Sequence, residues 1–267
     1  MQQADIPNLE TLRLEYPEPN VAHLVLDRPD NLNSVNETVL GELDEVMDLV
    51  ENDADARALL ITGAGDAAFC GGADLQFMGE GLDPFEAVEF SRLGQRVFGR
   101  LAELSVPVVA GIDGFALGGG MELATCVDLC VAGESAEFGQ PELNLGILPA
   151  WGGTQRLSRL VGERRAREIV LTAERYDAET MYDYGFVNEV VDDEDLEERA
   201  LELAATLAEG APLAQKATKA AMLAGRDDLD AGLQAESDAF GLLWTTEDTR
   251  EGIDAFHDRR EPDFEGR

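Results

Sequence analysis

The stretch DGFALGGGMELAT, Asp113–Thr125, places three consecutive glycines just before a carboxylate, Glu122. It follows the apolar run PVVAGIDG (residues 107–114), which is typical of a short buried strand, and a helical pattern begins near Met121. Glycine is a poor helix former, so Gly118–Gly120 do not serve the stability of that helix. Glycine-rich loops often bind phosphate, but this one lacks the lysine of a P-loop. The purpose of the glycines therefore has to be found in the rest of the chain.

Strand and helix signals alternate on both sides of this stretch. Residues 12–16 and the run from Val21 predict a hairpin, and the S-x-x-E spacing of Ser34 and Glu37 predicts a capped helix to about Asn52. Further strands are predicted at 56–63 and in DLCVAG, AEFG and NEVV, and further helices at 84–104 and in GGTQRLSRLVG, ERRAREIVLTA and AETMYDYG.

Only helices are predicted from about Asp193 onward. An alternation of strands and helices followed by helices alone indicates an α/β core. We therefore predict a core in residues 1–195 and a helical region in residues 196–267 that packs on the core and on neighbouring subunits.

The charge of the chain is strongly acidic. It has 55 Asp and Glu against 20 Lys and Arg, a formal net charge of -35. Such a surface lacks the basic patch that nucleic acids or anionic membranes require, so neither is expected as a partner. At molar salt the Debye length falls to about 3 Å and the self-repulsion is screened. We interpret the composition as an adaptation to a salty cytoplasm, an ordinary acidic protein being the alternative.

Several classes of protein are disfavoured by what the sequence lacks. The opening MQQADIPNLE has neither a basic start nor an apolar run, which argues against a cleaved leader, and no apolar stretch approaches membrane-spanning length. Cys70, Cys126 and Cys130 are an odd number, which fits a reducing cytoplasm. Cys126 and Cys130 could share a helix face, but no second pair completes a zinc site. His23 and His257 lie far apart, so neither a Ser-His-Asp triad nor a metal site is expected.

Two further motifs accompany the glycine stretch: FCGGADL at residues 69–75 and FGQPELNLGILPAWGGTQRL at residues 138–157. Together they resemble the crotonase family, whose type member is enoyl-CoA hydratase. The resemblance extends from DRPDNLNSVN near the start to TEDTREGIDAFHDRREPDF at the end. It implies an α/β fold, a spiral of ββα-type turns, with a C-terminal helical region used for trimerisation.

The resemblance gives the glycines a purpose. Members of the family bind acyl-CoA thioesters and stabilise an enolate with two backbone N–H groups, which by position are those of Ala73 and Gly119. Backbone donors must approach the thioester oxygen closely, and glycine permits that approach together with a positive φ. An oxyanion donor of this kind contributes ~10²–10³ in rate. The alternative for the triple glycine is tight packing of a helix on a sheet.

Two glutamates match the positions that hold the reacting water in the family's hydratases. Glu122 lies two residues after the triple glycine, and Glu142 lies in the QPE turn. Hydration needs one group to take a proton from water and another to deliver one to carbon 2. Isomerases and other lyases of the family usually lack or move one glutamate, so keeping both favours a hydratase. An isomerase, or a silent scaffold of the same fold, is the alternative.

The remaining positions carried over concern substrate binding, and several depart from the common pattern. Trp151 is large enough to narrow the acyl pocket, although it is equally compatible with a core role, and Asp30 and Gln76 stand where many relatives carry lysine. The resemblance implies these substrate-binding residues: Arg28, Leu32, Asp74, Leu75, Gly118, Ala150, Trp151, Phe240, Phe256 and Arg259. Phe240, Phe256 and Arg259 would act across a subunit boundary, with core packing as the alternative for the phenylalanines. No metal or redox cofactor is implied, because CoA belongs to the substrate.

Overall fold

The computed structural model describes residues 7–79 and 81–267. Most of the opening stretch on which we based the absence of a leader, residues 1–6, lies outside the described residues. The chain forms a six-stranded sheet in the order β1-β2-β3-β4-β6-β9 and a three-stranded sheet in the order β5-β7-β8. The first contains β1 (Leu12–Glu18), β2 (Val21–Leu26), β3 (Ala58–Gly63), β4 (Val108–Ile112), β6 (Leu129–Gly133) and β9 (Glu189–Val191), and the second contains β5 (Phe115–Leu117), β7 (Glu137–Gly139) and β8 (Arg175–Asp177).

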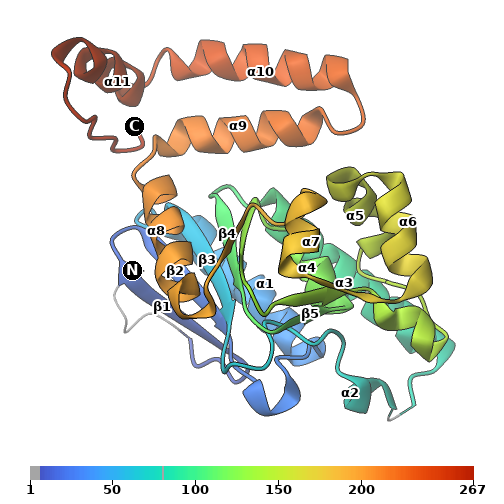
Figure 1. The fold of residues 1–267 in the computed structure, drawn as a ribbon. Coiled ribbons are helices and arrows are strands. Elements are labelled where there is room, and N and C mark those ends of the chain that lie inside the picture. The colour runs from blue at the N-terminus through green and yellow to red at the C-terminus, as the bar shows by residue number, and fades with distance from the viewer. Residues whose placement is uncertain (1–6, 80) are drawn as a thin grey trace.

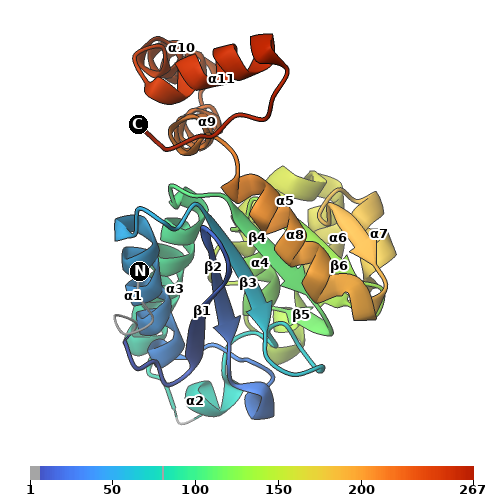
Figure 2. The same cartoon turned by 90° about the vertical axis from the view of Figure 1, so that its left-hand side faces the viewer.

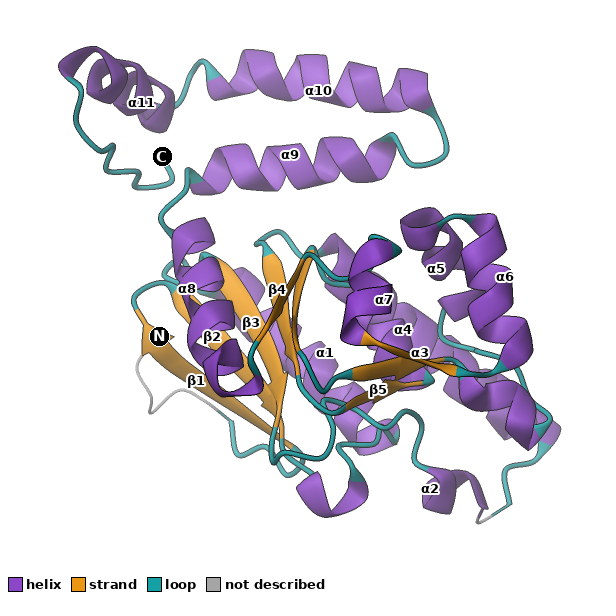
Figure 3. Ribbon diagram, viewed as in Figure 1, coloured by secondary structure: helices purple, strands orange, loops and turns teal. Residues whose placement is uncertain are grey.

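Helices surround both sheets, as Figure 3 shows. They are α1 (Glu37–Asn52), α2 (Leu75–Gly79), α3 (Pro84–Glu103), α4 (Gly119–Ala124), α5 (Gly153–Val161), α6 (Glu163–Thr172), α7 (Ala178–Asp183), α8 (Leu196–Ala208), α9 (Pro212–Ala224), α10 (Leu229–Leu243) and α11 (Glu247–Asp258). A 3-10 helix covers Pro141–Leu145, the predicted QPE turn. The predicted hairpin is the antiparallel pair β1–β2, and the helices and strands expected from the sequence are present close to their predicted bounds.

Successive units of the chain repeat one pattern. A strand of the large sheet runs into a short strand of the small sheet and then into a helix: β4 leads to β5 and α4, and β6 leads to β7 and the 3-10 helix. The chain after β3 joins the same arrangement, because Ala68 and Cys70 form bridges to Gly114 and Ala116 next to and within β5. These units confirm the predicted α/β spiral of ββα-type turns.

The core lies on both faces of the large sheet. On one face the apolar side of α1, including Val39, Leu43 and Met47, is buried with residues of α3 and the sheet. Helix α1 is capped by the side chain of Asn36, which accepts from the Val39 N–H at 3.1 Å. The predicted cap at Ser34 was therefore wrong by two residues, because Ser34 still belongs to the extended segment before the helix.

Helix α8 covers the opposite face. Ala200 and Ala204 pack with Leu60, Val109 and Val131 of the sheet strands. Figure 2 shows α8 lying across this face, whereas α9, α10 and α11 stand together beyond the end of the sheet. The predicted helical region 196–267 thus consists of one helix on the core and three helices beyond the end of the sheet (Figure 1). Of these three, α9 also contacts the core, because Lys219 donates to the carbonyl of Val106 at 2.7 Å.

The cysteines are buried and free, as expected for structural thiols. Cys126 and Cys130 do not share a helix face, because Cys126 follows the end of α4 and Cys130 is already in β6. Burial raises the pKa of the Cys70 and Cys130 thiols to about 12, so both stay protonated and unreactive. Among the described residues, no helix has both the length and the apolar character needed to cross a membrane.

Candidate active site

A cavity of about 650 Å³ lies where the three sequence motifs meet. The segment after β3 contributes Gly71, Gly72, Ala73 and Leu75, the start of α4 contributes Gly118, Gly119 and Glu122, and the segment 141–151 contributes Glu142 and Trp151. These segments are far apart in the sequence but adjacent in the fold, because the loop after β3 pairs with β5 and β5 pairs with β7. The spiral therefore brings together both predicted glutamates and both predicted oxyanion donors.

Each glycine of the triplet meets a different steric constraint. Gly118 has a φ of +53°, and a Cβ there would lie 3.1 Å from the Glu142 carboxylate. A Cβ on Gly119 would overlap the indole of Trp151, and one on Gly120 would overlap the carbonyl oxygen of Cys70. A larger residue is therefore disfavoured at each of the three positions. The glycines allow tight packing, which was the alternative that we considered, and Gly118 and Gly119 also line the cavity.

The backbones of Ala73 and Gly119 approach each other closely. A Cβ on Gly119 would lie 3.3 Å from the Ala73 nitrogen. Within residues 7–79 and 81–267, the N–H groups of Ala73, Gly119 and Ala150 donate no hydrogen bond. Ala73 and Gly119 therefore present neighbouring free donors at the cavity wall, the arrangement that an anionic oxygen requires.

Glu122 is almost fully buried, with a relative exposure of 2%. Its Oε1 accepts from the N–H groups of Trp151 and Gly153, each at 2.7 Å, and Gly153 is the first residue of α5. Burial raises the pKa of the Glu122 carboxyl, while the two backbone donors and the charge of Arg156 oppose that rise. The carboxylate is therefore fixed through Oε1.

Glu142 is held less firmly. Burial first, and then the neighbouring charge of Glu122, raise the pKa of Glu142 to about 7. The amide of Gln140, with its nitrogen turned toward Glu142, donates to both carboxyl oxygens at 2.9 and 3.2 Å. The two carboxyls thus differ in their surroundings: backbone donors and Arg156 limit the rise in the pKa of Glu122, whereas the pKa of Glu142 is raised to about 7.

The rest of the cavity wall is apolar. It is formed mainly by Leu75, Met78, Leu82, Phe90, Leu143, Leu145, Ile147 and Leu148. Trp151 is 3% exposed and packs edge-on against Phe90 and Phe98 of α3, with ring centroids 5.2 and 5.4 Å apart. The two alternatives for Trp151 therefore both apply, since its indole is part of the core and also closes one side of the cavity. An aliphatic chain fits such a wall.

Other predicted binding residues surround the cavity without lining it. Arg28 donates to Ser34 and forms an ion pair with Asp74 at 2.9 Å. Burial acts to raise the pKa of Asp74, but hydrogen bonds from Arg28 and from the Phe77 N–H outweigh it and lower that pKa. Both side chains therefore brace the loop that carries Ala73. Leu32 is half-exposed, and its carbonyl accepts from the Gly71 N–H at 2.7 Å.

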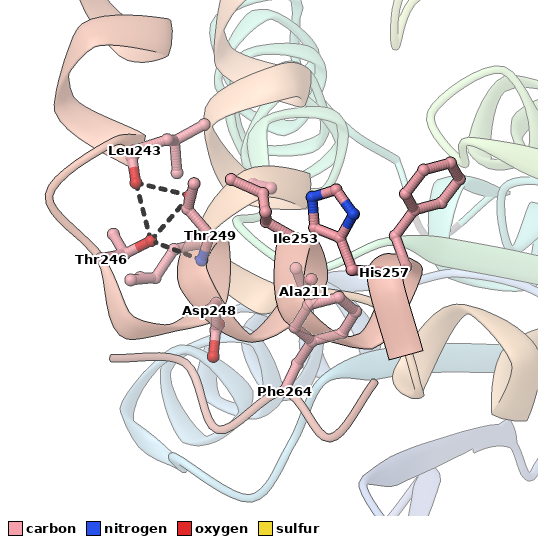
Figure 4. Close-up of a pocket in the computed structure, with 12 residues that line it drawn as sticks. Ala211, Leu243, Thr246, Asp248, Thr249, Ile253, His257 and Phe264 are labelled. Carbon is pink, nitrogen blue, oxygen red and sulfur yellow. Dashed lines mark hydrogen bonds between the residues drawn. The ribbon is translucent and has the colours of Figure 1, made fainter. Parts of the chain in front are cut away.

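The predicted residues of the C-terminal helices lie elsewhere in the described chain. Phe240 is on α10, Phe256 is on α11 and Arg259 follows α11; the phenylalanines are 64% and 82% exposed. Phe256 lines a second, mostly apolar cavity of about 520 Å³ (Figure 4), where Asp248, Thr249 and His257 are found but no pair of carboxylates. Among the described residues, no group of three or more His, Cys, Asp or Glu side chains could hold a metal ion.

Sequence reasoning missed Gln140, Arg156 and the α3 residues Phe90 and Ser91. Ser91 lies outside the motifs but contacts the site, because its hydroxyl donates to the carbonyl of Ala150 at 2.9 Å. Gln140 and Arg156 lie inside the quoted motif, so their position was a signal, but their roles depend on side-chain contacts that spacing does not reveal.

Comparison with known proteins agrees with this geometry. A family model described as enoyl-CoA hydratase/isomerase matches residues 17–267. The chain is 42% identical to crotonyl-CoA hydratase of Syntrophomonas wolfei, over 92% of this chain and 95% of the relative. It is 43% identical to short-chain-enoyl-CoA hydratase of Clostridium acetobutylicum, over 91% and 93%. The crystal structure of enoyl-CoA hydratase from Bacillus anthracis superposes with a TM-score of 0.93 at 37% identity, covering 97% of this chain and 100% of that one. With its motifs, fold and relatives in agreement, this chain belongs to the enoyl-CoA hydratase/isomerase family.

Proposed function

We propose that the protein is an enoyl-CoA hydratase, which adds water reversibly to a trans-2-enoyl-CoA and forms a 3-hydroxyacyl-CoA. The observation that carries the proposal is the meeting of two buried carboxyls and two free backbone N–H groups in one apolar cavity. Relatives at 42% and 43% identity are named as hydratases of crotonyl-CoA and short-chain enoyl-CoA. CoA enters as part of the substrate, and the proposal needs no other cofactor.

In the proposed reaction, a water held between the two glutamates attacks carbon 3. Glu122 accepts one proton of that water, and the electron pair of the double bond moves through carbon 2 onto the thioester oxygen. The N–H groups of Ala73 and Gly119 bind the resulting enolate oxygen. Glu142 then delivers its proton to carbon 2, which completes the 3-hydroxyacyl product. Transfer of the proton from Glu122 back to Glu142 restores the starting state.

The environments of the two carboxyls support this division of roles. Two backbone donors favour the anion of Glu122, as a base requires. Glu142, with a pKa raised to about 7, is protonated in a substantial fraction of molecules at neutral pH, as an acid requires. Both groups work in a cavity from which the apolar wall excludes bulk water.

Hydration of crotonyl-CoA tests the proposal directly. Loss of the absorbance of the conjugated thioester should follow addition of the protein in high salt. A protein that binds crotonyl-CoA but leaves that absorbance unchanged would instead be the silent scaffold that we weighed as an alternative.

We further propose a preference for short acyl chains. Trp151 and Phe90 fill the space between the cavity and α3, and a Cβ on Gly94 of α3 would overlap the indole. The ratio of kcat/KM for octenoyl-CoA to that for crotonyl-CoA should therefore rise in Trp151→Ala. Phe98→Leu is the matched control, because Phe98 packs on the same indole without lining the cavity. An equal rise in both variants would contradict the role of Trp151 as the limiting wall.

The remaining expectations belong to the same proposal. We infer a cytoplasmic enzyme that assembles as a trimer or a dimer of trimers through its C-terminal helices. In such an assembly Phe240, Phe256 and Arg259 would reach the CoA moiety bound to a neighbouring subunit. Their exposure on α10 and α11 in the single chain supports this placement.

A further inference from the structure

The turn that holds Glu122 separates two cavities. On one side lies the site described above, and on the other lies a polar cavity of about 590 Å³. Ser91, Leu148 and Ala150 line both. Arg156, on α5, lines the outer cavity and not the cavity of the candidate site.

Arg156 nevertheless reaches the backbone that binds Glu122. Its Nη1 donates to the carbonyl oxygen of Trp151 at 2.7 Å. Gly152 makes room for this contact, because it has a φ of +119° and a Cβ there would overlap the guanidinium. The side chain is thus folded back onto the turn rather than extended into solvent.

The geometry of the peptide bond carries the effect to the carboxylate. In a trans peptide the C=O and N–H point in opposite directions, so the Trp151 carbonyl and the Gly152 N–H form one rigid unit. The carbonyl side of that unit faces Arg156. The peptide lies between the Trp151 and Gly153 N–H groups, which donate the two 2.7 Å hydrogen bonds to Glu122. A cation that fixes this peptide therefore also fixes both donors.

The charges around Glu122 make this cation important. Glu142 faces Glu122 from the 3-10 helix, and the Cys126 thiol lies on the same segment as Glu122. The charge of Arg156 favours the anion of Glu122, and the charge of Glu122 in turn raises the pKa of Glu142. Besides Arg156, the outer cavity is lined by two acidic and two basic residues: Glu103, Asp227, Arg159 and Arg226.

We propose that Arg156 is a positioning residue for Glu122, which fixes the Trp151–Gly152 peptide and supplies the positive charge that keeps Glu122 available as a base. The inference rests on the proposed function, in which Glu122 accepts a proton from water. It assigns to Arg156 a role in the reaction without contact with the substrate.

The test compares the pH profile of kcat in three variants. The acidic limb of this profile is the low-pH side, where Glu122 becomes protonated and kcat falls. Arg156→Gln should move this limb upward by about 0.5–1 pH unit, because a nearby opposite charge is lost. KM should change little. Arg156→Lys keeps the charge and one donor, so its limb should stay at the wild-type position, and it remains informative if Arg156→Gln fails to fold. Arg159→Gln removes the same charge from the same helix, where Arg159 pairs with Asp227, and should leave the limb in place.

A second readout separates this inference from the proposed function. Carbon NMR of isotope-labelled glutamate carboxyls, with Glu122→Gln used for assignment, reports the titration of Glu122 without turnover. An upward shift of that titration in Arg156→Gln supports the inference even if crotonyl-CoA is not hydrated, in which case only the proposed function fails. An unchanged titration and limb in Arg156→Gln, equal shifts in Arg156→Gln and Arg159→Gln, or a moved limb in Arg156→Lys would overturn it.

Discussion

At the scale of single residues, the two glutamates are chemically alike but differently held. Glu122 is fixed by backbone donors from the turn before α5, and Glu142 is held by one side-chain amide. In the proposed mechanism an acid and a base therefore come from two residues of the same type, because their surroundings differ.

Replacing each glutamate by glutamine keeps its shape and removes the carboxylate. Each of Glu122→Gln and Glu142→Gln should lower hydration turnover by ~10²–10⁴, because each loses one proton-transfer step. Substrate binding should change little, since the oxyanion donors are backbone groups. The double variant should lose far less than the product of the single losses, because one water needs both partners.

The same variants distinguish a hydratase from an isomerase. If one glutamate were enough to move a proton between carbons, Glu122→Gln would spare double-bond migration while Glu142→Gln abolished it. Measurement of hydration and isomerisation on both variants decides between the two activities. Near-normal hydration in either single variant would show that the catalytic residues are misassigned.

Glu142 should also make the stability of the fold depend on pH. Its folded pKa of about 7 lies above the ordinary value of 4.5, so the folded state binds the extra proton between these values and loses stability as pH rises through them. Glu142→Gln should therefore be more stable than the wild type at pH 8, by up to about 3.5 kcal/mol for a pKa difference of about 2.5 at about 1.4 kcal/mol per unit, and the difference should become small near pH 4.5. Denaturant unfolding at both pH values measures it, with the exposed α6 residue Glu168→Gln as the control for charge. A gain independent of pH would contradict the linkage.

At the scale of elements, glycines inside helices show where the site constrains the scaffold. Gly94 is buried in α3 against the Trp151 indole, whereas Gly41 in α1 is exposed and has no atom within 4 Å of an added Cβ. Glycine destabilises a helix interior relative to alanine, so its retention at Gly94 has a packing reason that Gly41 lacks.

Alanine at these two glycines should have opposite effects on stability. Gly41→Ala should stabilise the protein by about 0.5–1 kcal/mol, because only helix propensity changes. Gly94→Ala should destabilise it by about 1–3 kcal/mol, because the new methyl overlaps the indole in a packed core. Thermal unfolding of both variants provides the measurement, and stabilisation by Gly94→Ala would show that Trp151 can move away.

At the scale of the whole molecule, the acidic charge leads to a prediction about the dependence on salt. The chain has few cations for its many anions, so one cation pairs with several carboxylates. Arg100 forms ion pairs with Asp44, Asp48 and Glu51 of α1. With a net charge of -35, most carboxylates still repel one another in dilute buffer, where the Debye length at 0.1 M is about 10 Å. Hydratase activity and the thermal midpoint should rise steeply as KCl is raised from dilute to molar. An enzyme most active and most stable in dilute buffer would contradict the proposed adaptation.

Assembly is the second property at this scale. Helix α10 and the residue after it expose four large apolar side chains by 50% or more: Leu233, Phe240, Leu242 and Trp244. Exposed apolar surface of this kind is typical of a contact between subunits. Light scattering in high salt should give three or six times the 28.9 kDa of one chain. Leu242→Asp should weaken that assembly, whereas Glu168→Gln should not. A sharp monomer of the wild type would remove the case for Arg259 acting across subunits.

The sequence alone determined the family and the order of strands and helices, because periodicity fixes secondary structure locally and three motifs in a fixed order identify the family. Through that resemblance it also pointed to Glu122 and Glu142 and to Ala73 and Gly119. The structure places all four at one cavity, and their roles in the reaction stay predictions. The cap of α1 was misplaced by two residues, because Ser34 and Asn36 are both suitable caps and only the chain path chooses between them.

Only the tertiary structure decided how the surroundings of these residues differ. The backbone donors of Glu122, and the charge of Glu122 that acts on Glu142, come from segments far away in the sequence. The same is true of Trp151, whose role depends on Gly94 and Gly119, and of Arg28, whose charge is taken up by Asp74. Spacing along the chain cannot encode such contacts, because they form only when the spiral brings β3, β5 and the turn before α5 to one place.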